Sequence, residues 1–296
     1  MNHNPLILSG KDVSLNVYEN LSLRIQKLSE VDILPGLAVV LVGENPASKV
    51  YVNSKTKTFK KLSIHSQTFK LSADVTSEDL LHLIEKLNKD SLYHGILVQL
   101  PLPDHINSQD VINSISPEKD VDGFHPQNAG LLSIGKPRFI PCTPKGIMRM
   151  LNFYNLDLNG KHVVVIGRSN IVGRPISILC SHKTAGANAT VTICHSGSKN
   201  IADMTSTADV IIVALGVPNY LKNNMVKDGS IIIDVGINRI NSDGNKKGYR
   251  LVGDADFSNL LSEVKAITPV PGGVGPMTIA MLVENTVEAA ESTLKK

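Results

Sequence analysis

Apolar runs alternate with amphipathic stretches along the first hundred residues. Strands are predicted at 37–42, 66–71 and 95–99. Helices are predicted between and after them, at 48–62 and from a capping box, Thr76-Ser-Glu-Asp79, through Leu87. Strands and helices that alternate at this spacing form βαβ units, so the pattern indicates a parallel sheet.

The second half repeats the alternation after a stretch rich in Pro and Gly at 123–144, which we interpret as the domain boundary. A helix is expected at 145–154, and a second begins after residue 173 and reaches about residue 182. Strands are predicted at 161–166, 189–194, 210–215 and 230–235. A last helix, 278–294, is expected to bury one face made of Ile279, Leu282, Val283, Thr286, Val287 and Ala290, and to pack back on the first domain.

Composition narrows the class of protein. The chain has 296 residues, which suggests two domains, and its 42% hydrophobic content is too high for a disordered chain. Only 4% of residues are aromatic, so the cores depend on Ile, Leu, Val and Ala, as in parallel α/β sheets. The net charge of 30 − 27 = +3 is too small to indicate a nucleic-acid partner, although it suits a small anionic ligand.

Several kinds of site are disfavoured. Three cysteines without a Cys-x-x-Cys pair predict neither a disulfide framework nor a zinc knuckle, and they favour a reducing compartment. The nine His residues show no metal-ligand spacing, so no metal site is expected. The N-terminus does not look like a signal peptide, and no apolar run approaches the roughly 20 residues that span a bilayer. We therefore expect a cytoplasmic protein without membrane contact.

The strand at 161–166 leads into the turn Gly167-Arg-Ser-Asn-Ile-Val-Gly173 and then a helix, an arrangement typical of a dinucleotide-binding turn. Ser169 occupies the position of the usual middle glycine, so the motif alone is weak, and an ordinary βα turn is equally compatible. No Asp or Glu lies between Arg168 and Ala202. Because an acidic residue there normally binds the ribose 2′-hydroxyl of NAD, its absence beside several cations favours NADP.

Two further features lie near predicted strand ends. Tyr51 and Lys55 are four residues apart on a predicted helix and share a face, which suits an aromatic platform beside an ammonium that transfers protons. A surface Tyr packed on a Lys stem gives the same pattern. Gln99 ends the strand 95–99, at the edge of a parallel sheet where ligands bind, although a Gln that caps its own loop is equally compatible.

Two loops complete the candidates. Lys119-Asp-Val-Asp-Gly123 offers carboxylates that suit a polar heterocycle better than a metal, and an Asp-Gly turn is the plainer alternative. Pro271-Gly-Gly-Val-Gly-Pro-Met-Thr278 offers backbone N–H groups at a helix start, or it is simply a tight interdomain turn.

These features occur together, in order and spacing, in one family. The sequence resembles the bifunctional methylenetetrahydrofolate dehydrogenase/methenyltetrahydrofolate cyclohydrolases. The resemblance spans nearly the whole chain, and its most specific strings are Gln-Leu-Pro-Leu-Pro at 99–103 and the loop 271–278. Further matching strings are 48–55, Phe124-His-Pro126 after 119–123, Pro141-Cys-Thr-Pro144, 167–175 and Asp234-Val-Gly-Ile-Asn238.

The resemblance implies two α/β domains. A folate-binding catalytic domain, 1–142, would be completed by the C-terminal helix, 276–296. A Rossmann-like NADP-binding domain would occupy 143–275, with the active-site cleft between the domains and a homodimer formed through the nucleotide domain. The substrates would be tetrahydrofolates, possibly polyglutamylated. The implied activity is NADP-dependent oxidation of 5,10-methylenetetrahydrofolate to the 5,10-methenyl compound, followed by hydrolysis to 10-formyltetrahydrofolate.

The same resemblance assigns residues. Lys55 would be the main catalytic group, Gln99 would hold and tune it, Tyr51 would stack on the folate, and Asp122 would anchor the pterin. Substrate contacts would include Leu100, Pro101, Pro271, Gly272 and Gly273. The cofactor site would be lined by Gly167, Arg168, Ser169, Ser196 and Ile237. A longer segment at 181–188 leaves the register of Ser196 open.

Three alternatives share parts of this pattern. A generic NADP-dependent dehydrogenase would have the glycine turn without the combination of Tyr51, Lys55 and Gln99. A family member that kept one activity would have the same fold. A nucleotide sensor would bind NADP without turnover.

Overall fold

The computed structural model describes residues 4–242 and 248–295, which form two compact units. The three-stranded unit consists of Asn16–Cys142 and the chain from Ile279 onward. The six-stranded unit consists of Thr143–Thr278 together with the described residues up to Leu15. This division groups the residues before Asn16 with Thr143–Thr278, whereas the domain division expected from the sequence places them with the rest of 1–142.

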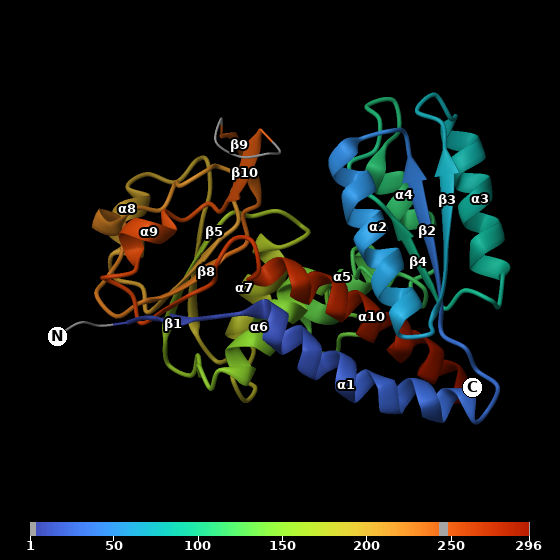
Figure 1. The fold of residues 1–296 in the computed structure, drawn as a ribbon, viewed down its shortest axis with the longest axis horizontal. Coiled ribbons are helices and arrows are strands. Elements are labelled where there is room, and N and C mark those ends of the chain that lie inside the picture. Colours follow the sequence, from blue (N-terminus) through green and yellow to red (C-terminus); the bar gives the residue numbers. More distant parts are fainter. Residues whose placement is uncertain (1–3, 243–247, 296) are drawn as a thin grey trace. The chain divides into compact units, whose positions relative to one another are not determined.

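The three-stranded unit contains a parallel sheet in the order β3-β2-β4 (Figure 1). Its strands are β2 (Gly36–Val42), β3 (His65–Leu71) and β4 (Gly95–Val98). Its helices are α2 (Pro46–Lys61), α3 (Ser77–Lys89), α4 (Ser108–Ser114) and α5 (Pro126–Ser133), with most of α1 (Gly10–Ser29) and α10 (Val274–Ser292). Every residue of β2 is buried, as expected for the central strand of a sheet covered on both faces.

Helix α3 shows how the local sequence builds this unit. The Thr76 side chain accepts a hydrogen bond from the Asp79 backbone N–H at 3.1 Å, which caps the helix start as predicted. Leu80, Ile84 and Leu87 recur at helical spacing, are buried, and pack against the sheet residues Ala38, Val40 and Val42. One apolar stripe therefore fixes the helix on the sheet.

The six-stranded unit contains a parallel sheet in the order β1-β11-β8-β7-β5-β6. Its strands are β1 (Leu6–Ile7), β5 (His162–Ile166), β6 (Thr190–Cys194), β7 (Val210–Val213), β8 (Ile231–Asp234) and β11 (Ala266–Ile267). A separate hairpin pairs β9 (Asn238–Asn241) with β10 (Tyr249–Val252), and the helices are α6 (Cys142–Phe153), α7 (Gly173–Ser181), α8 (Ile201–Thr205) and α9 (Phe257–Leu260). Two 3₁₀ turns, Asn223–Met225 and Thr293–Lys295, complete the described elements.

The strand order has a functional consequence. From β5 the chain moves outward to β6 and then crosses back to β7 on the other side of β5. In doubly wound sheets this reversal creates a crevice at the carboxyl ends of the two strands that flank it. The loops after β5 and β7 are therefore where a nucleotide is expected.

The sequence analysis missed several elements, among them α4, α8, α9 and the hairpin of β9 and β10. Helix α1 was not predicted, and α5 lies inside the Pro- and Gly-rich stretch interpreted as a boundary. Pro126 stands in the first turn of α5, where proline is tolerated because the first N–H groups need no helical partner. Helix α10 does not bury a single face, because every residue from Ala280 to Val287 is buried and Ile279 is only partly so.

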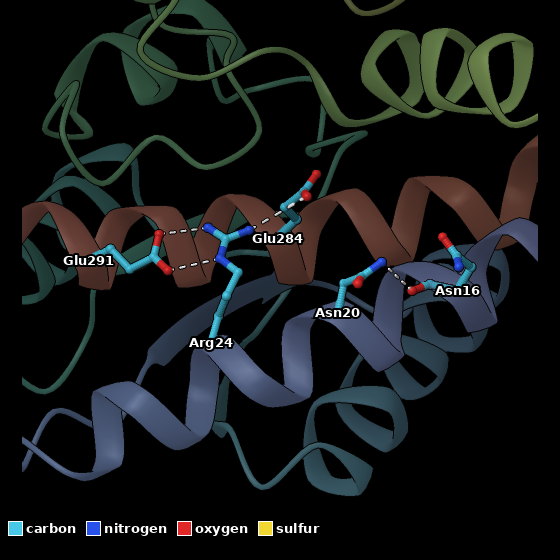
Figure 2. Close-up of polar contacts among 5 residues, drawn as sticks. All are labelled: Asn16, Asn20, Arg24, Glu284 and Glu291. Carbon is cyan, nitrogen blue, oxygen red and sulfur yellow. Dashed lines mark hydrogen bonds and ion pairs between the residues drawn. The ribbon is translucent and has the colours of Figure 1, made fainter.

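Helices α1 and α10 lie side by side in the three-stranded unit, as Figure 2 shows. The Arg24 guanidinium on α1 donates two hydrogen bonds to the Glu291 carboxylate of α10, at 2.8 and 2.6 Å. A second carboxylate, Glu284, lies 3.6 Å from the same guanidinium. This contact ties the last helix to the N-terminal half of the chain, as predicted. Among the described residues, no helix is long and apolar enough to cross a membrane.

Candidate active site and nucleotide-binding turn

Helix α2 carries Tyr51 and Lys55 on one face, as their spacing predicts. The Lys55 Nζ lies 4.9 Å from the centroid of the Tyr51 ring. Lys55 is only 5% exposed, which is unusual for a lysine. Because burial costs the charged form more than the neutral form, it lowers the pKa of the Lys55 ammonium, against the opposing effect of Asp122.

Gln99 follows β4 directly and faces this lysine. Its Oε1 accepts a hydrogen bond from Lys55 Nζ at 3.1 Å, while its Nε2 donates to the Leu100 carbonyl at 2.8 Å. The second bond fixes the orientation of the amide, so the acceptor oxygen and not the NH₂ group faces the ammonium. The peptide bond between Leu100 and Pro101 is cis.

Asp122 joins the same cluster from the loop before α5. The Cys142 thiol lies 3.6 Å from Asp122 Oδ1 and 3.5 Å from the Val121 carbonyl, and it is the donor in both contacts. Burial raises the pKa of the Asp122 carboxyl, while the nearby Lys55 ammonium opposes that shift. Burial thus favours the neutral form of both the lysine and the carboxyl, while each group's charge opposes the shift of the other.

Asp120, two residues earlier, has a different role. Its buried Oδ2 accepts hydrogen bonds from the His125 backbone N–H and the Asn128 side chain, both at 2.8 Å. Burial raises its pKa to about 6. Asp120 therefore holds the loop, and Asp122 is the carboxylate left for a ligand. Among residues 4–242 and 248–295, no group of three His, Cys, Asp or Glu side chains could hold a metal ion.

Helix α10 supplies a contact that the sequence analysis missed. The Asn285 Nδ2 donates to the Val121 carbonyl at 2.7 Å and to the Ile140 carbonyl at 3.0 Å, and it lies 3.7 Å from Cys142 Sγ. Asn285 thus holds both sides of the loop that carries Asp122. Nothing in the local pattern marks it, because its partners are far away in the sequence.

The turn after β5 has the backbone that the glycine spacing suggested. Gly167 adopts a φ of +129°, and a Cβ there or at Gly173 would collide with backbone atoms. The Ser169 Oγ accepts hydrogen bonds from the backbone N–H groups of Val172 at 3.1 Å and Gly173 at 3.4 Å. Ser169 therefore stabilises the start of α7 from the position usually taken by glycine, and Arg168 is exposed beside it.

Strand pairing shows where Ser196 lies in this chain. Ile166 pairs with Cys194, and the Gly167 N–H donates to the Cys194 carbonyl at 2.9 Å. Ser196 is exposed two residues beyond this point. The structure therefore brings the loop of Ser196 beside the glycine turn.

Ile237 and the loop 271–273 lie together in the six-stranded unit. They line one pocket of about 170 Å³, with residues 234–236, Leu251, Pro269, Val270 and 274–276. The Ile237 side chain is 53% exposed, so it is available for an apolar contact with a ligand. A residue predicted to bind cofactor thus shares a pocket with three predicted to bind substrate.

Comparison with known proteins assigns a family to these features. Residues 8–122 match the tetrahydrofolate dehydrogenase/cyclohydrolase catalytic domain, and residues 141–294 match the NAD(P)-binding domain of the same family. A bifunctional FolD protein from Geotalea daltonii is 53% identical over 96% of this chain and 98% of its own.

Solved structures agree. The bifunctional FolD enzyme of Campylobacter jejuni has a TM-score of 0.91 and 49% identity over 97% of this chain and 99% of its own. The Trypanosoma brucei enzyme, solved in complex with NADP cofactor and an inhibitor, has a TM-score of 0.93 and 34% identity over 99% of both chains. The chain belongs to the bifunctional tetrahydrofolate dehydrogenase/cyclohydrolase family.

Proposed function

We propose that this chain oxidises 5,10-methylenetetrahydrofolate with NADP and hydrolyses the 5,10-methenyl product to 10-formyltetrahydrofolate. The observation that carries the proposal is the buried Lys55, with its Nζ 3.1 Å from Gln99 Oε1 and the Tyr51 ring beside it. A protonatable amine next to an aromatic face suits a planar heterocycle that must exchange protons.

The residues of the three-stranded unit are proposed to bind the folate. Tyr51 stacks on the ring system, and Asp122 accepts hydrogen bonds from the pterin. The loop after β4 contributes the contacts of Leu100 and Pro101. Pro271, Gly272 and Gly273 of the six-stranded unit are proposed to contact the same substrate. Asp122 is suited to its role because Asp120 already satisfies the donors of the loop, at 2.8 Å each.

The family binds NAD(P), and we propose NADP for this chain. Gly167, Arg168, Ser169, Ser196 and Ile237 are the residues that would hold it. The stretch from Arg168 to Ala202 contains no carboxylate to bind a ribose 2′-hydroxyl, and Arg168 is exposed in the turn, where it suits a 2′-phosphate. When bound, NADP supplies the hydride acceptor for the one-carbon bridge. The chain's own residues orient the substrate for that step, and no protein proton moves.

Hydrolysis is where Lys55 acts. Water adds to the methenyl carbon and loses one proton, and a second proton passes from the added oxygen to a ring nitrogen as the carbon–nitrogen bond breaks. Neutral Lys55 accepts the first proton. Its ammonium then donates a proton to the nitrogen and the amine takes up the proton of the added oxygen, so Lys55 relays the second proton, and the one net proton of the reaction leaves Lys55 for solvent. The lowered pKa of Lys55 makes the neutral amine available, and Gln99 Oε1 stabilises the ammonium.

A two-stage spectrophotometric assay tests the proposal. Purified enzyme is given methylenetetrahydrofolate with NADP or with NAD, and NADPH or NADH formation is followed. The decay of added methenyltetrahydrofolate is then measured separately. Both activities with a clear preference for NADP are expected. Activity in only one stage indicates a family member that kept a single function, and NADP binding without turnover indicates a sensor.

Three further expectations from the sequence analysis stay proposals. These are a homodimer formed through the nucleotide-binding domain, the domain division 1–142 with 276–296 against 143–275, and a cytoplasmic location. Sedimentation equilibrium tests the first, because a dimer has twice the 31.9 kDa chain mass.

A further inference from the structure

Asp254 is fully buried in the six-stranded unit and connects two loops. Its Oδ2 accepts hydrogen bonds from the backbone N–H groups of Leu215 at 2.6 Å and Gly216 at 2.8 Å, in the loop after β7. Its Oδ1 accepts a hydrogen bond from the Asn238 side chain at 2.8 Å, at the end of the loop after β8. One carboxylate therefore fixes the carboxyl ends of two neighbouring strands.

A second buried carboxylate holds Asp254 itself in place. Asp234 Oδ1 accepts from the backbone N–H groups of Asp254 and Gly236, and its Oδ2 accepts from Ala255, each at 2.9 Å. The Asp234 backbone N–H donates to Thr268 Oγ1 at 2.7 Å. The position of Asp254 is thus determined by the end of β8, the strand that leads into the loop it binds.

Two glycines make this arrangement possible. A Cβ at Gly236 would collide with the Asp254 carboxylate, and a Cβ at Gly253 would collide with the Asp234 carboxylate. The string Asp234-Val-Gly-Ile-Asn238 thereby has a physical explanation. Its first residue orders the backbone, its glycine leaves room for Asp254, and its last residue donates to Asp254.

The two loops border the place where the nucleotide is expected. Ala214 begins the loop after β7, and its carbonyl lies so close to Gly167 that a Cβ there would collide with it. Ile237, exposed beside Asn238, lines the pocket with the loop 271–273. Ligands of parallel sheets bind at these carboxyl ends. The Asp254 carboxylate accepts its hydrogen bonds from loop backbone and from Asn238. Its effect on a ligand is therefore indirect, through the positions of the two loops.

We propose that Asp254 and Asn238 are positioning residues for the nucleotide, because their hydrogen bond sets the distance between the loops after β7 and β8. This inference rests on the proposed NADP-dependent function. It adds that the affinity for the nucleotide depends on a hydrogen-bonded pair outside the glycine turn, the buried Asp254 and the partly buried Asn238.

Exchanging the two side chains tests the pair. In Asn238→Asp, two carboxylate oxygens face each other where a donor met an acceptor. In the double variant Asn238→Asp/Asp254→Asn, the donor and acceptor exchange places and the bond is restored. The Kd for NADPH is measured by fluorescence titration, and the KM for NADP is measured with saturating methylenetetrahydrofolate. The exposed Asp228→Asn is the matched control for removing one carboxylate from this unit.

The expected result is a rise of at least about tenfold in the Kd for NADPH and the KM for NADP in Asn238→Asp. The double variant should return both values to within about threefold of the parent. Hydrolysis of added methenyltetrahydrofolate should keep the parent rate throughout, because that step needs no nucleotide turnover. The proposal is overturned if Asn238→Asp binds NADPH like the parent, or if the double variant stays as weak as the single one.

A folding failure is recognised separately. If Asn238→Asp also loses the hydrolysis activity and the circular dichroism spectrum of the folded parent, Asn238→Ala is used in its place. This variant removes the donor without adding charge, and the same tenfold criterion applies. If the parent binds NADPH but does not oxidise the folate, the proposed function is wrong. The NADPH titrations of the variants still test the role of Asn238 and Asp254 in that case.

Discussion

Substituting Lys55 by Met separates the two chemistries of the proposed site. Met keeps the length of the side chain and removes its charge. The expected cost in stability is small, because two effects oppose each other. The variant loses one hydrogen bond from a charged group, the 3.1 Å contact with Gln99, worth roughly 1.5–3 kcal/mol. It also removes a charge that is only 5% exposed, whose burial costs several kcal/mol.

The effect on hydrolysis is expected to be much larger than any effect on stability. A positioned acid or base contributes about 10²- to 10⁴-fold, equivalent to roughly 3–5 kcal/mol of activation free energy. The Lys55→Met variant should therefore lose methenyltetrahydrofolate hydrolysis by at least about a hundredfold. Its dehydrogenase should be reduced but measurable, because hydride transfer needs oriented rings and no proton from the protein.

The assay follows both steps in one reaction. With methylenetetrahydrofolate and NADP, the variant should form NADPH and accumulate the methenyl compound, which the parent converts further. Lys57→Met is the matched control, since it makes the same change on the exposed part of α2. Unfolding in urea verifies that the variant is folded. The hypothesis is falsified if folded Lys55→Met hydrolyses the methenyl compound as fast as the parent.

Three further outcomes are expected. Arg168→Ala should raise the KM for NADP at least about tenfold and change the use of NAD much less; an equal effect on both would assign Arg168 to the shared part of the cofactor. Asp122→Asn should weaken folate binding and lower both activities, measured as KM and kcat in each half-reaction. If the variant binds folate as tightly as the parent, Asp122 is a turn residue without a role in binding. Asp120→Asn tests how the buried Asp120 carboxyl makes the free energy of unfolding depend on pH. The folded pKa of about 6 lies above the unfolded value of 3.8, so the folded parent retains a proton that the unfolded chain releases. The free energy of unfolding of the parent, relative to the Asn variant, should therefore fall by about 2 kcal/mol as pH rises from 4 to 6. Urea unfolding of both proteins across this range measures the difference, and a constant or rising value would contradict the sign.

Local patterns predicted the elements that present the site. Helix α2 and strand β4 follow directly from spacing and apolar runs, so the side-by-side placement of Tyr51 and Lys55 and the strand-end position of Gln99 could be expected from the sequence. The contact between Lys55 and Gln99 was expected only from the family resemblance, and the structure shows it at 3.1 Å.

Long-range partners could not be predicted in this way. The Asn285 amide meets a carbonyl 164 residues earlier in the chain, and Asp254 meets N–H groups 39 and 38 residues earlier. Neither residue interrupts a pattern or belongs to a periodic stripe. The complete burial of residues 280–287 was missed for a related reason, since a helix that is apolar on several sides shows only a weak amphipathic signal.

The exposed fraction distinguishes the carboxylates that stabilise loops of this protein from the one that is proposed to bind its substrate. Asp120, Asp234 and Asp254 are each at most 2% exposed, and every one of them accepts hydrogen bonds from backbone N–H groups of a loop. Asp122 is partly exposed, and the Cys142 thiol, a weak donor, lies 3.6 Å from its Oδ1. A carboxylate whose acceptor sites are already occupied by the fold has little left to offer a ligand. The one with unoccupied acceptor capacity beside a buried lysine is therefore the one that fits a pterin, although Asp120 and Asp122 are indistinguishable as letters in the string 119–123.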